Sequence, residues 1–325
     1  MKSFEPTITK QDIQKVTEVL ESGNIGFGSN VIEFENRFSK HSNKKYNIGL
    51  NSASAAAYCL YAYLYEKYGR CDIYTPSLGF TSVSWAAEKN GHRVIFVDVD
   101  DNLLFDFDSY KRLREDPYVK EGTGNKKILM PVLYGGVSNI PNFNEQVTDE
   151  IVVVDSAHCI QPTIESDYIF FSFHPIKPLT MSCGGLLGTD DEEANEYICS
   201  YRNFGRQNVG DTYDIVNSGF NFYMNNLNAT LGLSQLDSCL ENIEKRKYNL
   251  EYFKKSVILD IGYFTEHDEK SSYYLGTLIL NQKGSIKLRK KLIDNGCSAS
   301  FHYPYLHKSQ YYNSNVSLKH LDNLD

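Results

Sequence analysis

Residues 170–185 read FFSFHPIKPLTMSCGG, a run that leads from an apolar strand to a lysine between two prolines and then to a glycine pair. Lysine is among the residues least often buried, so the ordinary interpretation of Lys177 is a solvated side chain on a surface loop. The alternative is a lysine that the strand and the flanking Pro175 and Pro178 hold in one fixed position. The rest of the chain decides between these two interpretations.

Other short apolar runs alternate with helical patterns on both sides of this stretch. Strands that are apolar throughout and separated by helices are typical of a parallel sheet covered on both faces. We therefore expect an α/β protein with a large domain whose mostly parallel sheet is covered by helices. The expected strands are YNIGL (46–50), CDIYTP (71–76), RVIFVDVD (93–100), KILMPVLYGG (127–136), IVVVDSAH (151–158), YIFFSF (168–173) and a further one at the start of 185–205.

A second, smaller unit is expected because 325 residues exceed one typical domain. From about Met224 a long helical stretch runs through Lys255, and a mixed strand pattern (271–280) and a short helix (286–296) follow. We expect residues 1–235 to form the large domain and residues 236–325 a smaller α+β C-terminal domain. An amphipathic helix capped by Thr9 and Asp12 is expected near the N-terminus and should pack on the smaller domain.

The amino-acid composition argues against several classes of binding partner. The net charge is −8, and the 33 basic residues are dispersed, which argues against nucleic acid or an anionic membrane as the main partner. The longest nearly apolar run, ASAAAYCLYAYLY (53–65), is too short to span a bilayer. The N-terminus lacks an apolar signal core, and the seven cysteines contain no CxxC pair. We therefore expect a cytoplasmic protein with reduced thiols and no metal site.

Residues whose side chains can take part in catalysis or ligand binding occur at the ends of the expected strands, where doubly wound sheets bind their ligands. Pyridoxal phosphate needs a lysine for covalent attachment, an acid beside its ring nitrogen, a cradle for its phosphate and a flat contact for its ring. The start of a helix is a natural anion cradle because its N–H groups are free. The candidate for covalent attachment is Lys177, and the candidate acid is Asp155. The candidates for the phosphate cradle are Ala53, Ser54 and Ser172, and the flat contact would be Phe80.

Each candidate has an ordinary structural alternative. An aspartate at a strand end is often a helix cap, Ser54 belongs to a segment that can be a plain N-cap, and a lone phenylalanine such as Phe80 is usually core. Their occurrence as an ordered set, at strand ends on one side of one sheet, favours the cofactor over these alternatives.

The chain also resembles nucleotide-sugar aminotransferases of the DegT/DnrJ/StrS family, which are pyridoxal-phosphate enzymes of fold type I. The strand-terminal aspartate followed by SFHPIK is the most specific part of this resemblance, which covers nearly the whole chain. The matching stretches are GFGSNVIEFENRF (26–38), NSASAAAYCL (51–60), PSLGFTSVSWAAEKNGHRVIFVDVD (76–100), PVLYGG (131–136), VVDSAHCI (153–160), FSFHPIKPLTMSCGG (171–185), YRNFG (201–205), GFNFYMNNLNATLGLSQL (219–236) and HYPYLHKSQYY (302–312).

The resemblance assigns roles to matching positions. Lys177 would attach the cofactor and move the substrate proton, Asp155 would hold the ring nitrogen, and His158 would lie near the phenolic oxygen of the ring. Asn221 matches an asparagine that reaches the phosphate in the neighbouring subunit, which implies a homodimer with shared active sites. The remaining matches are Ala53, Ser54 and Ser172 for the phosphate, Phe80 for stacking on the ring, and His302 and Tyr303 for the sugar pocket.

Several positions depart from the family pattern. Tyr223 stands where the family usually has arginine, which puts any contact of that arginine in doubt. Gly79 replaces a frequent threonine, and Ser182-Cys183 replaces a frequent Gly-Glu pair. The smaller domain is also expected to be shorter than usual. None of these departures affects Lys177 or Asp155.

The reaction implied by the resemblance is a ping-pong transamination. L-Glutamate would convert the cofactor to pyridoxamine phosphate, which would then aminate a keto group of a nucleotide-linked, 6-deoxy hexose for amino-sugar, surface-polysaccharide or secondary-metabolite synthesis. One alternative is a sugar dehydratase, although in those relatives the lysine is replaced by histidine. A second is a cofactor-binding regulatory paralogue without turnover. A metal enzyme is a weaker idea, because His302 and His307 have a poor ligand spacing.

Overall fold

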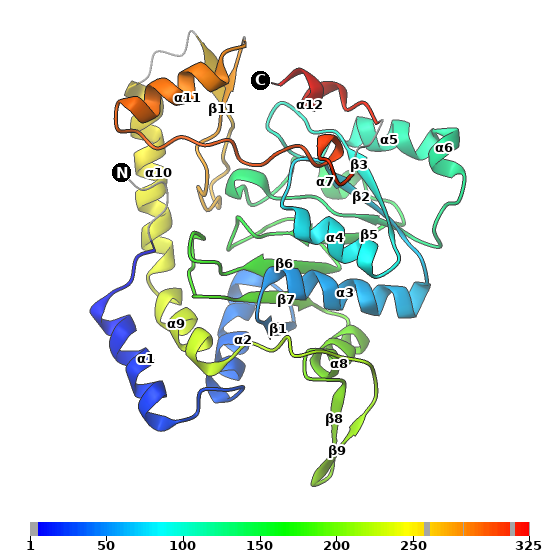
Figure 1. Cartoon of the computed structure of the whole chain (residues 1–325), viewed down its shortest axis with the longest axis vertical. Coiled ribbons are helices and arrows are strands. Elements are labelled where there is room, and N and C mark those ends of the chain that lie inside the picture. Colours follow the sequence, from blue (N-terminus) through cyan, green and yellow to red (C-terminus); the bar gives the residue numbers. More distant parts are fainter. Residues whose placement is uncertain (1–5, 257–260, 282, 313–315, 325) are drawn as a thin grey trace.

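The sheet at the centre of the molecule has seven strands in the order β1-β7-β6-β5-β4-β2-β3 (Figure 1). The computed structural model describes residues 6–256, 261–281, 283–312 and 316–324. In this sheet β7 runs antiparallel to both of its neighbours and every other pairing is parallel, so the predicted, mostly parallel sheet is confirmed. Its strands are β1 (Tyr46–Leu50), β2 (Asp72–Pro76), β3 (Arg93–Val97), β4 (Lys127–Leu129), β5 (Ile151–Asp155), β6 (Tyr168–Ser172) and β7 (Gly185–Thr189).

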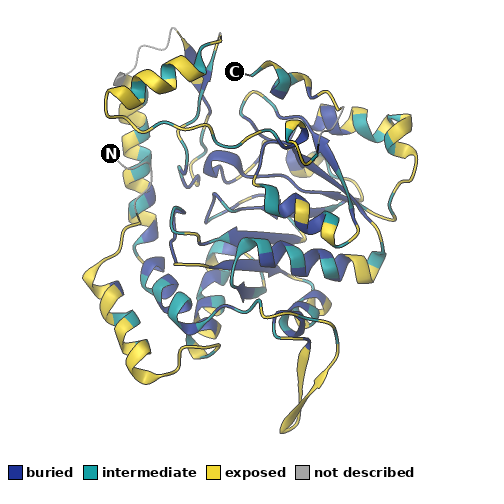
Figure 2. Cartoon of the chain, in the orientation of Figure 1, coloured by how far each residue is buried: buried dark blue, intermediate teal, exposed yellow. Residues whose placement is uncertain are grey.

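Helices cover both faces of the sheet, and Figure 2 shows the strands of this sheet largely in the dark blue of buried residues. Alternate residues of each strand point to opposite faces, so Val153 of β5 belongs to one buried cluster and Val154 to the other. One face is covered by α3 (Ala53–Tyr68), α4 (Thr81–Lys89) and α8 (Glu192–Tyr201). The other is covered by α2 (Ser29–Ser42), α5 (Phe107–Glu115), α7 (Phe143–Gln146) and α9 (Asn226–Leu236).

The pairing of the central strands determines which residues meet at the carboxyl edge of the sheet. Asp155, the last residue of β5, pairs with Phe170 of the parallel strand β6. Ser172, the last residue of β6, pairs with Gly185 at the start of the antiparallel strand β7. The strand ends predicted to carry chemistry are therefore adjacent in the fold.

The N-terminal helix α1 (Lys10–Ser22) begins with the predicted cap, in which Thr9 and Asp12 bond each other's backbone N–H. It packs along α9, where the side-chain amide of Gln235 donates to Asp12 Oδ2 at 3.0 Å. The predicted long helical stretch divides into α9 and α10 (Cys239–Ser256). The division of the chain near residue 235 stays a prediction.

The C-terminal part begins with a two-stranded antiparallel sheet and ends on the large sheet. Strands β10 (Gly262–Phe264) and β11 (Leu278–Leu280) pair, and α11 (Ser285–Asp294) follows them. The chain then returns to the strand β3 side of the molecule, where the backbone N of Leu306 donates to the carbonyl of Ser77 at 3.0 Å. The short helix α12 (Lys319–Asn323) starts on the buried carboxylate of Asp98, which accepts from His320 N at 2.6 Å. The remaining short elements are α6 (Pro117–Lys120) and the 3₁₀ turns η1 (Tyr134–Gly136) and η2 (Leu306–Lys308).

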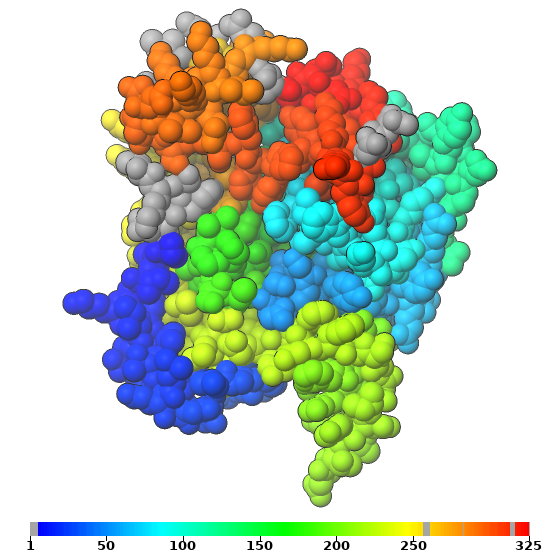
Figure 3. All heavy atoms as spheres, in the orientation of Figure 1, coloured from blue at the N-terminus to red at the C-terminus, as the bar shows by residue number. Residues whose placement is uncertain are grey.

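A β-hairpin that the sequence analysis did not predict projects from the body of the protein. It consists of β8 (Arg206–Val209) and β9 (Thr212–Ile215), and every residue of both strands is exposed. Figure 3 shows it standing clear of the remaining atoms at one end of the molecule. Among the described residues, no helix has both the length and the apolar composition needed to cross a bilayer.

Candidate active site

Asp155 ends β5 with its side chain almost completely buried, at 4% exposure. Its Oδ1 atom accepts a hydrogen bond from the backbone N of Ala157 at 2.9 Å. Among the described residues no hydrogen bond reaches its Oδ2 atom. Burial raises the pKa of Asp155 to about 6, against the opposing effects of the Ala157 bond and the charge of Lys177. The carboxylate therefore has one oxygen available for a cationic or N–H partner.

Lys177 lies in a tight turn that follows β6. Its backbone N donates to the carbonyl of His174 at 2.8 Å, and the turn is closed by Met181 N, which donates to Phe173 O at 2.8 Å. Its side chain is buried, at 8% exposure, so the interpretation as a solvated surface lysine is wrong. Burial lowers the pKa of Lys177 to about 8, while the charge of Asp155 opposes this change.

An aromatic wall lies beside the Lys177 amine and consists of Tyr274, His158 and Tyr303. Its Nζ atom lies 4.4 Å from the centroid of the Tyr274 ring. The ring of His158 lies with its centroid 4.3 Å from that of Tyr274. His158 Nε2 is 3.1 Å from the hydroxyl of Tyr303, while its buried Nδ1 has no hydrogen-bond partner among the described residues. Burial, with Lys177 and His302 nearby, lowers the pKa of His158 well below its usual value, so the ring is neutral.

His302 and Tyr303 reach this wall from the C-terminal part of the chain. The ring centroid of His302 is 5.7 Å from that of His158, and that of Tyr303 is 6.0 Å from it. Burial and the charge of Lys177 lower the pKa of His302 to about 4. The hydroxyl of Tyr134 donates to the carbonyl of His302 and fixes the backbone here. The structure thus brings together three of the predicted site residues, His158, His302 and Tyr303, while their roles stay predictions.

The start of α3 lies beside the first residue of β7. Ser52 caps the helix by accepting from Ala55 N at 3.1 Å, and Ser54 Oγ donates to Ser82 Oγ at 2.8 Å. Among the described residues no hydrogen bond uses the backbone N–H of Ala53 or Ser54. A Cβ atom on Gly185 would lie 2.2 Å from the carbonyl carbon of Ser52, so only glycine permits this approach. Ser172 pairs with Gly185, which packs against Ser52 and Ala53, so the predicted phosphate residues lie in one region of the fold.

Phe80 and Asn221 lie at the edge of the candidate active site. Phe80 is 54% exposed, and its ring centroid is 5.7 Å from that of Tyr303, which places it at the outer side of the aromatic wall. Asn221 is exposed, and its carbonyl accepts from Asn51 Nδ2 at 3.2 Å, at the end of β1. In the part of the chain that the structure describes, no hydrogen bond links the Asn221 side chain to the other predicted site residues.

The two histidines considered as metal ligands have separate environments. His307 Nδ1 is 2.6 Å from Ser77 Oγ, and its Nε2 is 3.2 Å from Asp322 Oδ1. This arrangement fastens the C-terminal tail, while His302 faces His158. The described residues contain no group of three or more His, Cys, Asp or Glu side chains arranged to hold a metal ion.

Sequence reasoning missed Tyr274, which contacts the amine of Lys177, and Arg246, which lines a cavity together with Lys177. Tyr274 lies in a segment that reads as a strand, and Arg246 lies on a helix with several other basic residues. Neither residue has a spacing or a motif that distinguishes it from its neighbours, so only the folded arrangement reveals them.

Comparison with known proteins gives a consistent result. The profile of the DegT/DnrJ/EryC1/StrS aminotransferase family matches residues 6–323. The spore coat polysaccharide biosynthesis protein SpsC of Bacillus subtilis is 28% identical, over 98% of this chain and 86% of that protein. The structure of PseC, a Helicobacter pylori aminotransferase of pseudaminic acid biosynthesis, superposes with a TM-score of 0.87 at 24% identity, over 99% of this chain and 90% of the other.

A third similar structure bears on the cofactor. Spr1654 of Streptococcus pneumoniae, described as a sugar aminotransferase, was solved in a form with pyridoxal phosphate. It superposes with a TM-score of 0.85 at 23% identity, over 96% of this chain and 87% of the other. These superpositions confirm the predicted fold, that of the fold type I pyridoxal-phosphate enzymes.

Proposed function

Because this chain belongs to the DegT/DnrJ/EryC1/StrS aminotransferase family, we propose that it transfers the amino group of L-glutamate to a keto group of a nucleotide-linked 6-deoxy hexose, with pyridoxal phosphate as cofactor. The observation that carries this proposal is the buried pair of Lys177 and Asp155 at the ends of neighbouring strands, each altering the pKa of the other. Perturbed ionisable groups of this kind are typical of functional sites.

The residues present fit pyridoxal phosphate. Asp155 offers a free carboxylate oxygen for a protonated ring nitrogen, and the unpartnered Nδ1 atom of His158 offers a hydrogen bond to a polar ring substituent. Backbone N–H groups at the start of α3 suit a phosphate. When bound, the cofactor supplies an electron sink that lets the carbon bearing the amino group release its proton.

Lys177 then serves as the residue that moves this proton. A lysine must be neutral to accept a proton at Nζ, and the low pKa of about 8 provides neutral amine near physiological pH. The surrounding Tyr274, His158 and Tyr303 side chains limit access of water to that atom. Asp155, with a pKa of about 6, is mostly ionised at neutral pH and can stabilise the protonated ring nitrogen.

The substrate class follows from the relatives. SpsC is named for polysaccharide biosynthesis, and a Campylobacter jejuni relative that is 25% identical is named as a transaminase that forms a UDP-linked amino sugar. We extend this class to the present chain and place its work in the cytoplasm, in the synthesis of amino sugars for polysaccharides or secondary metabolites. His302 and Tyr303 are assigned to the sugar pocket, and Phe80 to the ring face.

A homodimer is part of the proposal. The hairpin carries exposed apolar side chains, including Val209 at 55%, Tyr213 at 50% and Ile215 at 57% exposure. Tyr213 and Ile215 lie on one face of the hairpin and Val209 on the other. Exposed apolar side chains on a projecting hairpin suit a protein interface. Asn221 follows the hairpin in sequence, is exposed and has no side-chain hydrogen bond among the described residues, which suits a role in the active site of a second copy.

The test is direct. Purified protein loaded with pyridoxal phosphate is mixed with L-glutamate, and the cofactor absorbance is followed. The amino form is then offered a panel of nucleotide-linked keto-sugars, and the products are analysed by mass spectrometry. An amino sugar is the expected product. Absence of any glutamate-dependent spectral change would support a regulatory paralogue instead, and a deoxygenated product without nitrogen would support a dehydratase.

A further inference from the structure

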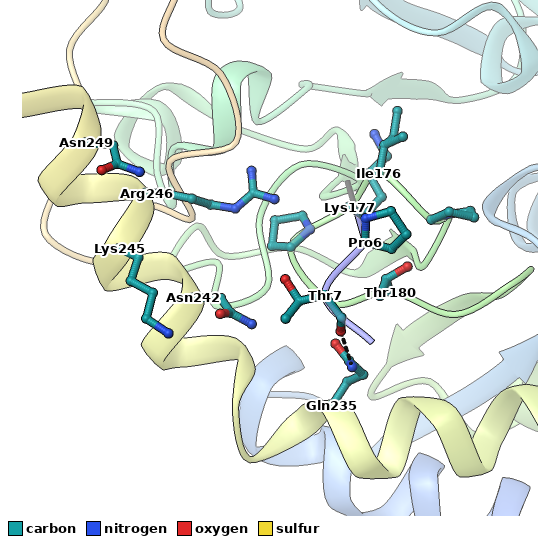
Figure 4. A pocket seen from close by; sticks show the side chains of 12 residues that line it. Pro6, Thr7, Ile176, Lys177, Thr180, Gln235, Asn242, Lys245, Arg246 and Asn249 are labelled. Atoms are coloured by element: carbon teal, nitrogen blue, oxygen red, sulfur yellow. Dashed lines mark hydrogen bonds between the residues drawn. The ribbon is translucent and has the colours of Figure 1, made fainter. Parts of the chain in front are cut away.

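A cavity of about 290 Å³ lies beside Lys177, between the lysine turn and α10. Figure 4 shows Arg246 extending from α10 toward the turn, with Asn242 on the same helix. The N-terminal residues Pro6 and Thr7 line another side of the cavity. The carbonyl of Thr7 accepts a hydrogen bond from Gln235 Nε2 at 2.9 Å, which holds this segment in place. Of the described residues that line the cavity, three are basic and none is acidic.

Arg246 is the unusual member of this lining. It is partly buried, and among the described residues no hydrogen bond or ion pair involves its guanidinium group. Burial lowers the pKa of Arg246, with a smaller opposing effect from the nearby Tyr274 hydroxyl. The ring of Tyr274 also contacts the amine of Lys177. Buried charges in proteins are normally paired with an opposite charge. The unpaired guanidinium therefore indicates an anion that binds from solution.

We propose that Arg246, together with the side-chain amide of Asn242, binds an oxyanion of the substrate and that this oxyanion is the α-carboxylate of the amino donor. This inference rests on the proposed function. The α-carboxylate is attached to the same carbon as the amino group that reacts at Lys177. Because Lys177 and Arg246 line the same cavity, a donor bound there would have its α-carboxylate on the Arg246 side. The diphosphate of a nucleotide sugar is separated from its reacting carbon by the sugar ring and is the less suitable occupant.

The guanidinium group is well suited to a carboxylate. Its planar fork donates two parallel hydrogen bonds to the two carboxylate oxygens, and such charge-assisted pairs are stronger than neutral ones. A site of this kind makes the enzyme selective for amino acids over simple amines as donors. It does so without any contact to the sugar.

The experiment uses the enzyme loaded with pyridoxal phosphate and measures the two half-reactions separately. In Arg246→Gln, the glutamate concentration for half-maximal conversion of the cofactor should rise roughly 10- to 100-fold, the range expected when a charged hydrogen bond is lost. The reaction of the amino form with keto-sugar nucleotide should be unchanged. Arg246→Lys should restore part of the effect, and Asn242→Ala should show a smaller loss in the same half-reaction. Lys255→Gln, which removes an exposed charge from the same helix, is the control.

A second readout does not depend on turnover. Binding of maleate, a dicarboxylate without an amino group, is measured by calorimetry on the same loaded proteins, and it should weaken in Arg246→Gln by a similar factor. A loss confined to the sugar half-reaction would assign the site to the diphosphate and overturn the proposal, as would wild-type behaviour of Arg246→Gln and Asn242→Ala in both assays. If the wild-type protein fails to react with glutamate, the proposed function fails, while maleate binding still tests Arg246.

Discussion

The Nζ atom of Lys177 lies 4.4 Å from the centroid of the Tyr274 ring, which comes from a distant part of the chain. The aromatic face replaces water around the amine and gives only part of the stabilisation that full hydration would give to its charged form. Burial in this setting outweighs the favourable charge of Asp155, and the pKa of Lys177 falls to about 8. Packing thus prepares the lysine for chemistry before any ligand is bound.

The first prediction concerns the pH dependence of cofactor attachment. The neutral amine is the nucleophile, so the rate at which pyridoxal phosphate attaches to the cofactor-free protein should rise with pH and level off above a midpoint near 8. Stopped-flow absorbance over a series of buffers measures this rate. A midpoint near 10.5, the ordinary value for lysine, would contradict the structure.

Replacement of the lysine should remove both attachment and turnover. Lys177→Ala is expected to lose the absorbance of the attached cofactor and to lower the rate of amino transfer by about 10²- to 10⁴-fold, the usual contribution of a positioned acid–base group. Borohydride reduction followed by peptide mass spectrometry identifies the attachment site. Labelling at another lysine in the wild-type protein would rule out the assignment.

Asp155→Asn should separate activity from stability. The rate of amino transfer should fall on the order of 10²-fold, as when one preorganised electrostatic partner is removed. The pKa of Asp155 is raised in the folded state, so the ionised carboxylate opposes folding at neutral pH and the neutral amide does not. Thermal melting of the cofactor-free variant should therefore show a Tm equal to or above that of the wild type. A large drop in Tm would show that the carboxylate has a structural role instead.

Gly185→Ala tests the contact between β7 and the start of α3. The added Cβ atom would lie 2.2 Å from the carbonyl carbon of Ser52 and 2.3 Å from Ala53 N, so the helix start must move. We expect weaker binding of pyridoxal phosphate, measured by equilibrium dialysis. Gly184→Ala is the matched control, because its Cβ atom would meet the flexible side chain of Met181. Equal affinities in the two variants would argue against a phosphate cradle at this position.

The hairpin gives a prediction about assembly. A double change, Tyr213→Asp and Ile215→Asp, puts two charges on its exposed apolar surface and should convert a dimer to a monomer in sedimentation velocity. Because Asn221 is expected to act in the neighbouring copy, the monomer should also bind the cofactor less tightly. A variant that sediments like the wild type would exclude the hairpin from the interface.

The parts of the fold that depend on local pattern could be predicted from the sequence. Apolar runs such as 46–50 and 151–155 became strands, and the Thr9–Asp12 cap began a helix. Asp155 and Lys177 could be singled out as candidates because Asp155 ends a buried strand and Lys177 lies in the turn after the next strand. The hairpin could not, since both of its strands are exposed and lack a buried face that would impose an alternating pattern.

The remaining residues depend on long-range packing. Tyr274 contacts Lys177, and Arg246 lines a cavity with it, although both residues are far from Lys177 in the sequence. The return of the tail to β3 relies on the buried side chains of Asp98 and His307. None of these contacts has a signature in the spacing of residues, so the sequence alone leaves them undetermined.

The attachment of the tail has a consequence for access to the reactive lysine. The segment bearing His302 and Tyr303 is tethered on one side by the Tyr134 hydroxyl and on the other by the bond from Leu306 to Ser77. A segment that is hydrogen-bonded at both ends forms a fixed rim of the active site and does not act as a mobile loop. Discrimination among sugars then resides in the size and polarity of the side chains on that rim, so exchanging them should alter sugar preference without altering the chemical step.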